Sequence, residues 1–156
     1  MPKSYVSTEP AAARAVRLKC ETCVQVTERV KTLERNGHEA KKIELIIKGG
    51  TWSSYPWKYR KWFIKRCFDA ANHLGEEKRK RFYTLAESQN ANETAEYRVI
   101  GLTIETRPDW VYPSEIHRLR ELGVTRVELG IQALDDEILD LTQRGHKIEH
   151  AIRATI

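Results

Sequence analysis

Three segments of the chain combine glycine with polar residues directly after or within apolar stretches. They are Gly49-Gly50-Thr51, the run 103–109 (Thr-Ile-Glu-Thr-Arg-Pro-Asp) and the run 128–132 (Glu-Leu-Gly-Ile-Gln). Glycines let a backbone approach a ligand closely, although they equally serve tight turns. Glu105 and Arg107 lie two residues apart, so they share one face of an extended strand. Such a pair can bind the two ends of a zwitterion or the hydroxyls of a ribose, and a structural ion pair is the alternative.

Glu128, Gly130 and Gln132 are spaced at i, i+2 and i+4, so in a strand they point the same way. A buried carboxylate and a buried amide are costly unless they are paired. We therefore expect these residues to face a polar ligand, and the alternative is an irregular strand that faces solvent.

The spacing of apolar residues predicts the elements that carry these motifs. We expect one long helix over 11–36 ended by Gly37, with a buried stripe that includes Val16 and Cys20. Further elements are predicted as strands at 42–48, 98–104 and 124–131, and as helices at 57–74, 85–95, 114–122, 134–141 and from 146 onward. The first strand is expected to be covered on both faces, and Ser114 to cap the helix that follows the second.

Strands that alternate with helices predict an α/β fold with a parallel sheet of about three strands. The carboxyl ends of parallel strands meet at one edge, where functional groups gather in such folds. All three segments described above fall at predicted strand ends, so we expect a single site there. Three strands do not close a barrel, and the chain begins and ends with helices. We therefore expect it to be truncated at both ends.

The composition of the 156 residues limits the classes of protein to which the chain can belong. With 40% hydrophobic and 31% charged residues the chain is globular, and no apolar run is long enough to span a bilayer. No signal peptide is expected at the amino terminus. The 27 basic and 22 acidic residues leave a net charge of +5, which permits a nucleic-acid partner. Three cysteines are too few for a disulfide scaffold and are typical of a reducing compartment.

Two further groups allow more than one interpretation. Cys20 and Cys23 have the spacing of a metal or redox pair, but no second pair accompanies them, so we expect them to pack as small apolar residues. His146 and His150 lie at i, i+4 without an accompanying carboxylate motif, and we expect surface histidines.

The predicted helix 57–74 carries basic residues interleaved with aromatic ones, a combination that can bind nucleic acid. The alternative is an amphipathic helix with Trp62, Phe63 and Cys67 in the core and solvated basic residues. We favour this second interpretation. The basic residues are Lys58, Arg60, Lys61, Lys65 and Arg66.

In this order, the motifs resemble the radical S-adenosylmethionine (radical SAM) domain of the Elongator complex catalytic subunit, the tRNA carboxymethyluridine synthase family. The resemblance extends over nearly the whole chain. The matching segments are Pro2–Tyr5 with Glu9-Pro10, Asn36–His38, Lys42–Ile46 with Gly49–Thr51, Gly101–Asp109, Thr125–Gln132 and Arg144–His146.

The resemblance implies that residues 1–156 form part of a TIM-like (β/α) barrel domain, without the rest of the barrel and without the acetyltransferase domain. It implies S-adenosylmethionine and a [4Fe-4S] cluster as cofactors, acetyl-CoA as co-substrate, and carboxymethylation of C5 of the wobble uridine in tRNA. By similarity Gly49, Gly50 and Thr51 hold the methionine end of S-adenosylmethionine. Residues that line the same pocket by similarity are Glu105, Arg107, Glu128 and Gln132. Lys42 matches a family lysine associated with acetyl-CoA.

The sequence departs from the family in its cysteines. The family's cluster cysteines precede the segment that matches Pro2–Tyr5, and Cys20, Cys23 and Cys67 do not match that motif. We therefore expect no radical chemistry, no catalytic residue and no metal ligand from this chain alone. The alternatives are an inactive tRNA-binding or scaffold piece and a radical enzyme that acts on a small molecule. The resemblance also implies a cytoplasmic protein, no membrane partner, and either Elongator-type accessory subunits or self-association.

Overall fold

The computed structural model describes residues 6–76 and 80–156, so the segment Pro2–Tyr5 lies outside the described residues. The elements, in chain order, are α1 (Pro10–Arg17), α2 (Thr22–Arg35), β1 (Lys42–Ile47), the 3-10 turn η1 (Trp52–Ser54), α3 (Trp57–Asn72), α4 (Leu85–Asn92), β2 (Arg98–Thr106), the 3-10 turn η2 (Pro108–Trp110), α5 (Pro113–Glu121), β3 (Arg126–Leu129), α6 (Asp136–Leu141) and α7 (Ile148–Thr155).

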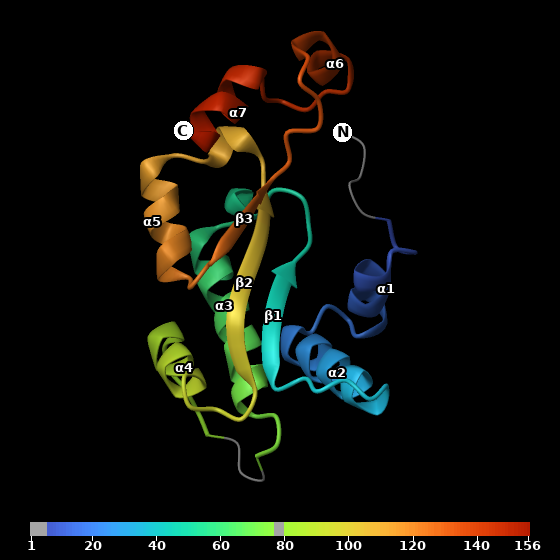
Figure 1. Cartoon of the computed structure of the whole chain (residues 1–156), viewed down its shortest axis with the longest axis vertical. Helices are drawn as coiled ribbons and strands as arrows, with labels where there is room; N and C mark the ends of the chain where they lie inside the picture. Colours follow the sequence, from blue (N-terminus) through green and yellow to red (C-terminus); the bar gives the residue numbers. More distant parts are fainter. Residues whose placement is uncertain (1–5, 77–79) are drawn as a thin grey trace.

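The three strands form one parallel sheet in the order β1-β2-β3, which confirms the predicted α/β fold. Parallel neighbours require crossover connections, and the helices between the strands supply them. The register places Ile47 beside Ile104 and Glu105 beside Glu128, so the carboxyl ends of all three strands lie at the same edge. Figure 1 shows this edge at the top, where α6 and α7 also lie.

Helices cover one face of the sheet. In Figure 1, α3 lies behind the strands, with α4 and α5 beside it. The core forms on this side because alternate residues of β2 point toward α3. Ile64 and Phe68 of α3 pack with Leu102 and Ile104 of β2 and with Leu122 after α5, and all five are at most 6% exposed.

The opposite face of the sheet is open, so the prediction that β1 is covered on both faces was wrong. Along β1, half-buried residues alternate with exposed ones, and Ile46 is 45% exposed. No helix crosses this face in Figure 1 among the described residues. Polar and charged side chains therefore share this face with Ile46 and remain accessible to a ligand.

The predicted helix 11–36 is two helices. Lys19 and Cys20 take left-handed backbone conformations, with φ of 52° and 57°, and they turn the chain between α1 and α2. Neither residue is a glycine, so the sequence carries no signal for this break. As a consequence, the predicted buried stripe is interrupted: Val16 is 65% exposed and Cys20 is exposed, whereas Val30 is buried.

Two boundaries also differ from the prediction. Ser114 does not cap α5, because Pro113 occupies the first turn and the extended Tyr112 precedes it. Proline suits that position since its missing N–H has no partner there in any case. The third strand ends at Leu129, earlier than predicted, because the chain turns away at Gln132, whose φ is 72°.

A buried ion pair joins α3 to α5. Both terminal nitrogens of Arg60 donate to the Glu115 carboxylate, and the two side chains are only 3% and 1% exposed. The guanidinium carbon of Arg60 also lies 5.2 Å from the ring centre of Trp57. Burial of either charge without the other would carry a large desolvation cost, so the pair fixes how α5 packs on α3.

We predict that Glu115→Ala lowers the free energy of unfolding by about 3–5 kcal/mol, because it leaves Arg60 buried and unpaired. The matched control is Glu121→Ala, at the end of the same helix, which removes an exposed partner of Lys61 and should cost less than about 1 kcal/mol. Urea unfolding followed by circular dichroism measures both. Equal losses in the two variants would contradict the structural role of the buried pair.

Candidate functional site

The turn after β1 forms an open glycine cradle. Gly49 and Gly50 have φ of 154° and 83°, conformations that other residues adopt only with strain. A methyl group added at either position would meet no atom within 4 Å. Thr51 follows, and its carbonyl accepts a hydrogen bond from the Ser54 amide, which closes η1. The backbone at Gly49 and Gly50 is therefore shaped and open for a ligand to approach.

A charged ladder crosses the open face beside this cradle. Its five members come from all three strands and from the end of β1: Glu44, Lys48, Glu105, Arg126 and Glu128. Arg126 Nη2 lies 3.0 Å from Glu44 Oε1 and 3.6 Å from Glu128 Oε1. Arg126 Nε donates to the hydroxyl of Thr103, which is fully buried. The ladder thus alternates acidic and basic groups across the strands.

Lys48 connects the carboxyl ends of the three strands. Its Nζ lies 2.5 Å from Oε1 of Glu105 and 3.5 Å from Oε2 of Glu128. These two glutamates are register neighbours on β2 and β3, where like charges repel unless a cation lies between them. Lys48 supplies that cation and lies directly before the glycine cradle. The structure therefore brings together Gly49, Gly50, Glu105 and Glu128, four of the predicted site residues, at one edge.

The sequence suggested that Arg107 binds a ligand or pairs with Glu105, but its guanidinium is held by other groups of the protein. Its Nε and Nη2 donate to the two carboxylate oxygens of Asp109 at 2.9 and 2.5 Å, and its Nη1 donates to the carbonyl of Arg144 at 3.1 Å. A side chain on Gly145 would lie 3.1 Å from Arg107 Nη1. Arg107 therefore ties the segment before α7 to the turn that follows β2.

The i, i+2, i+4 alignment of Glu128, Gly130 and Gln132 is interrupted, since the strand ends at Leu129. The amide of Gly130 still bonds to the carbonyl of Thr106 at 2.9 Å, but the chain then turns. Gln132 Nε2 lies 2.9 Å from where a Gly130 side chain would begin. The Gln132 side chain thus folds back over Gly130, beside the end of β2.

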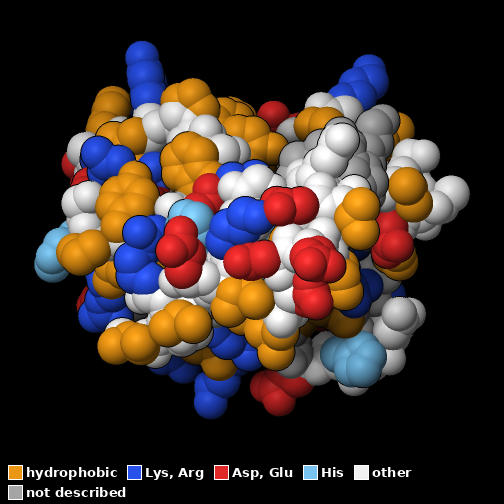
Figure 2. Space-filling view, turned by 90° about the horizontal axis from the view of Figure 1, so that it is seen from above, with side chains coloured by type: hydrophobic (Ala, Val, Ile, Leu, Met, Phe, Trp, Pro, Cys, Tyr) orange, Lys and Arg blue, Asp and Glu red, His pale blue; other side chains and the backbone are white. Residues whose placement is uncertain are grey.

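Figure 2 looks onto the edge where the strands end. Acidic and basic side chains gather near the middle of this view, and apolar side chains surround them. Sequence reasoning missed Lys48, Arg126 and Glu44 as members of this site. The signal was present for β1, because Glu44 and Lys48 alternate with the apolar residues of the core face. Lys42, by contrast, lies at the opposite end of β1, away from the glycine cradle.

The cysteines lie elsewhere and do not form a metal site. Cys20 is exposed between α1 and α2, so the prediction that it packs in the core was wrong. Cys23 is half-buried and donates its thiol to the carbonyl of Arg66, and Cys67 is buried. Burial raises the pKa of both the Cys23 and the Cys67 thiols, which disfavours the thiolate that binds metals. Among residues 6–76 and 80–156, no group of three metal-ligating side chains exists.

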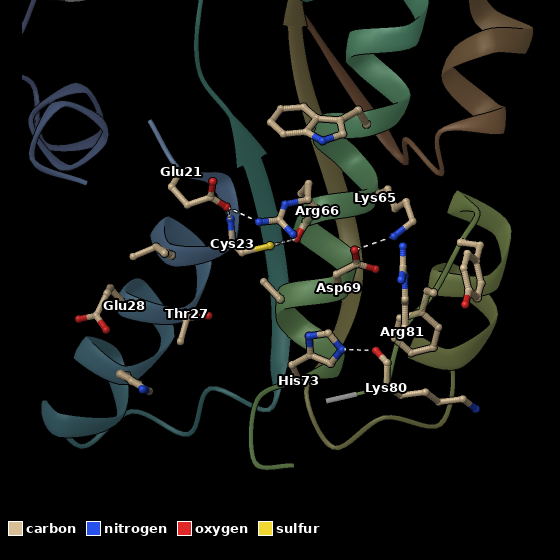
Figure 3. Close-up of a pocket in the computed structure, with 16 residues that line it drawn as sticks. Glu21, Cys23, Thr27, Glu28, Lys65, Arg66, Asp69, His73, Lys80 and Arg81 are labelled. Atoms are coloured by element: carbon tan, nitrogen blue, oxygen red, sulfur yellow. Dashed lines mark hydrogen bonds and ion pairs between the residues drawn. The ribbon is translucent and has the colours of Figure 1, made fainter. Parts of the chain in front are cut away.

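Two of the basic residues of α3, Lys65 and Arg66, line a groove of about 880 Å³ between α2, α3 and residues 80–83. Figure 3 shows Arg66 beside Glu21 and Lys65 beside Asp69 in this groove. Arg66 lies 2.5 Å from Glu21, and Lys65 lies 2.7 Å from Asp69. Trp62 is 47% exposed, so its predicted place in the core was wrong. Because Lys65 and Arg66 already have acidic partners, these two cations are poorly suited to bind the phosphates of a nucleic acid.

His146 was predicted to be a surface histidine, and this was wrong. It is 3% exposed, and its Nε2 lies 3.0 Å from the carbonyl of Ile131. His150 instead accepts a hydrogen bond from the Lys147 amide through Nδ1 at the start of α7. The two histidines therefore have separate structural roles.

A family model decides the assignment of the chain. The model of the radical SAM superfamily matches residues 13–155. The chain belongs to the radical SAM superfamily. This confirms the resemblance that the strand-end motifs indicated, and the open three-stranded sheet matches part of a radical SAM (β/α) fold.

Relatives of this radical SAM chain match nearly its whole length. It is 44% identical over 155 residues to a protein of Methanocaldococcus jannaschii named tRNA uridine(34) acetyltransferase, and 33% identical over 148 residues to human Elongator complex protein 3. These matches cover 99% and 94% of this chain but only 28% and 26% of the relatives. The solved structure of Methanocaldococcus infernus Elp3 with an N-terminal deletion matches 90% of this chain, and 32% of its own, with a TM-score of 0.83 and 44% identity.

Superfamily membership implies S-adenosylmethionine and an iron–sulfur cluster. The open cradle at Gly49 and Gly50, next to paired carboxylates, fits a ligand that carries an amino-acid end and hydroxyl groups. The cysteines do not fit a cluster, because they form no ligand group in the described part of the chain and burial raises the pKa of the Cys23 and Cys67 thiols. Within the same residues, no helix has the length and apolar character needed to cross a membrane.

Asp109 should make stability depend on pH. Burial raises its pKa, but the hydrogen bonds and charge of Arg107 outweigh that effect and hold the pKa below the ordinary 3.8. Its stabilisation is therefore present above the unfolded-state pKa and is lost as the pH falls through the lowered folded-state pKa. We predict that Asp109→Asn lowers the free energy of unfolding by about 2 kcal/mol at pH 7, and that the difference is smaller at pH 3 than at pH 7. Urea unfolding at both pH values measures this, and an unchanged difference would contradict the pairing.

The cysteines yield a second prediction. Anaerobic treatment of the chain with iron and sulfide should produce no cluster on Cys20, Cys23 and Cys67. A variant with alanine at all three positions should therefore give the same visible absorption and the same iron content as the natural chain. Stoichiometric iron that is lost in the variant would show that these cysteines do bind a cluster.

Proposed function

We propose that this chain is the S-adenosylmethionine-binding part of a radical enzyme that uses acetyl-CoA to carboxymethylate C5 of the wobble uridine in tRNA. The observation that carries the proposal is the open glycine cradle beside the paired carboxylates Glu105 and Glu128. Its support comes from a relative at 44% identity that is named tRNA uridine(34) acetyltransferase. When bound, S-adenosylmethionine supplies the radical that starts such chemistry.

Each site residue has a proposed part in binding. The backbone of Gly49, Gly50 and Thr51 would hold the methionine end, since the two glycines carry no side chain that would prevent close approach. Glu105 and Glu128 would accept hydrogen bonds from the ammonium group or the ribose hydroxyls. Arg107 would act by positioning, because its guanidinium is engaged by Asp109 and by the Arg144 carbonyl. The amide of Gln132, folded over Gly130, would line the same pocket.

The remaining proposals concern the whole protein, because the chain spans about 28% of the length of its curated relatives. Residues 1–156 would form part of the radical SAM domain. The resemblance assigns the cluster ligands to a segment ahead of Pro2–Tyr5. Lys42 would contact acetyl-CoA at a distance from the glycine cradle, since it lies at the other end of β1. The partners would be tRNA and Elongator-type subunits or a second copy, in the cytoplasm.

An inactive tRNA-binding or scaffold piece is the second candidate. The two candidates differ in whether the glycine cradle binds S-adenosylmethionine. A radical enzyme that acts on a small molecule differs from both, because it would bind the cofactor but not tRNA.

We predict that Gly50→Ala weakens binding of S-adenosylmethionine to the full chain by about tenfold or more, because the added methyl group fills the cradle. Gly37→Ala is the matched control. Gly37 has φ of 84° against 83° for Gly50, and a methyl group would also meet open space there, but it lies after α2. Both variants therefore carry similar backbone strain, and only Gly50→Ala changes the cradle.

Ligand-observed NMR measures the binding of S-adenosylmethionine, and fluorescence anisotropy at several salt concentrations measures the binding of tRNA. Equal binding of S-adenosylmethionine by the two glycine variants would contradict the proposed cradle. Salt-dependent tRNA binding without cofactor binding would favour the inactive piece. Cofactor binding without tRNA binding would favour an enzyme that acts on a small molecule.

A further inference from the structure

The two carboxylates at the carboxyl edge of the sheet are already held by a cation of the chain itself. Glu105 and Glu128 are register neighbours, and Lys48 Nζ contacts both, at 2.5 and 3.5 Å. The Glu105 side chain is only 18% exposed, so its charge is partly desolvated and depends strongly on a nearby cation. Lys48 therefore lies where a positively charged group of a ligand would find the strongest attraction on this edge.

We propose that Lys48 competes with the cationic part of S-adenosylmethionine and so sets the affinity and charge selectivity of the site. This inference rests on the proposed function, because it takes the glycine cradle as the place where the ligand binds. S-adenosylmethionine carries a sulfonium and an ammonium group, and both are repelled by a lysine ammonium in the same pocket. A ligand cation that approaches Glu105 and Glu128 competes with the Lys48 ammonium, which already contacts both carboxylates.

The surroundings of Lys48 allow it to withdraw. Its side chain is 38% exposed and has four flexible carbons, so its ammonium can return to water. The residues that follow it, Gly49 and Gly50, have open space around them. Glu128 keeps a second cation, Arg126, at 3.6 Å when Lys48 moves away. Displacement therefore removes the 2.5 Å ion pair with Lys48 from Glu105, the more buried of the two carboxylates, and lets the ligand's positive charge take the place of Lys48.

The test compares two ligands that differ by one charge, S-adenosylmethionine and S-adenosylhomocysteine, which lacks the sulfonium. We expect Lys48→Met to bind S-adenosylmethionine about tenfold more tightly than the natural chain does at low salt, and S-adenosylhomocysteine about threefold more tightly. The difference between the ligands should shrink as salt is raised. Lys48→Arg keeps the charge and should behave like the natural chain.

Lys41→Met is the control for net charge. Lys41 pairs with Glu96 before the start of β1, away from the cradle, and its loss should change neither affinity. Circular dichroism melting establishes that each variant is folded before binding is compared.

The outcomes separate this inference from the proposed function. Equal tightening for both ligands would overturn the charge competition and indicate a change in shape alone. Weaker or unchanged binding of S-adenosylmethionine by Lys48→Met would overturn the inference and leave the cradle in place. Absence of S-adenosylmethionine binding by the natural chain and all variants would overturn both the proposed function and the competition.

Discussion

The structure depends on the ion pairs that neutralise the charged side chains on one face of its parallel sheet. The face toward α3 is apolar and packed, whereas the opposite face carries the charged ladder of Glu44, Lys48, Glu105, Arg126 and Glu128. Parallel strands set these carboxylates on neighbouring strands, so each needs a cation within reach. Among the described residues, Lys48 at the end of β1 and Arg126 at the start of β3 are such cations. This arrangement keeps the carboxyl edge polar and accessible, which a ligand-binding edge requires.

The rest of the fold supports that edge from behind. The buried pair of Arg60 and Glu115 fixes α5 on α3, and α5 leads into β3 and its glutamate. Arg107 joins the turn after β2 to the segment before α7 through Asp109 and the carbonyl of Arg144. The charged residues that the sequence predicted to bind a ligand therefore have two different positions in the structure. Some, such as Glu105, lie beside the cradle, and others, such as Arg107, hold the loops that surround it.

Much of the fold follows from local patterns, and the exceptions have physical causes. Apolar runs, glycines and prolines predicted three parallel strands and most helices, because burial on one side imposes their periodicity. The break at Lys19 and Cys20 was not predictable, since only tertiary packing selects a left-handed conformation at residues other than glycine. The left-handed conformation of Gln132, which is not a glycine either, was likewise not predictable, and β3 therefore ended earlier than expected. The open face of β1 was misjudged, because its apolar composition resembles that of a strand buried on both sides.

For the candidate site, the sequence predicted the positions of several residues but not their contacts. Gly49, Gly50, Glu105 and Glu128 meet because carboxyl ends of parallel strands share an edge, and strand order alone predicts that meeting. Lys48 was missed, because its role depends on which side chains surround its ammonium, and the sequence does not state this. For the basic residues of α3, the sequence allowed a nucleic-acid site that the contacts do not favour. Lys65 pairs with Asp69 of α3 itself, and Arg66 pairs with Glu21 in the turn before α2.

The central claim is that the cofactor binds on the open carboxyl edge. Its most direct test is a titration of the isotope-labelled chain with S-adenosylmethionine, followed by amide chemical shifts in NMR spectra. The account predicts that the largest shifts fall at residues 48–51 and around Glu105 and Glu128. Shifts confined to the groove between α2 and α3, or no shifts at a saturating concentration of ligand, would contradict it.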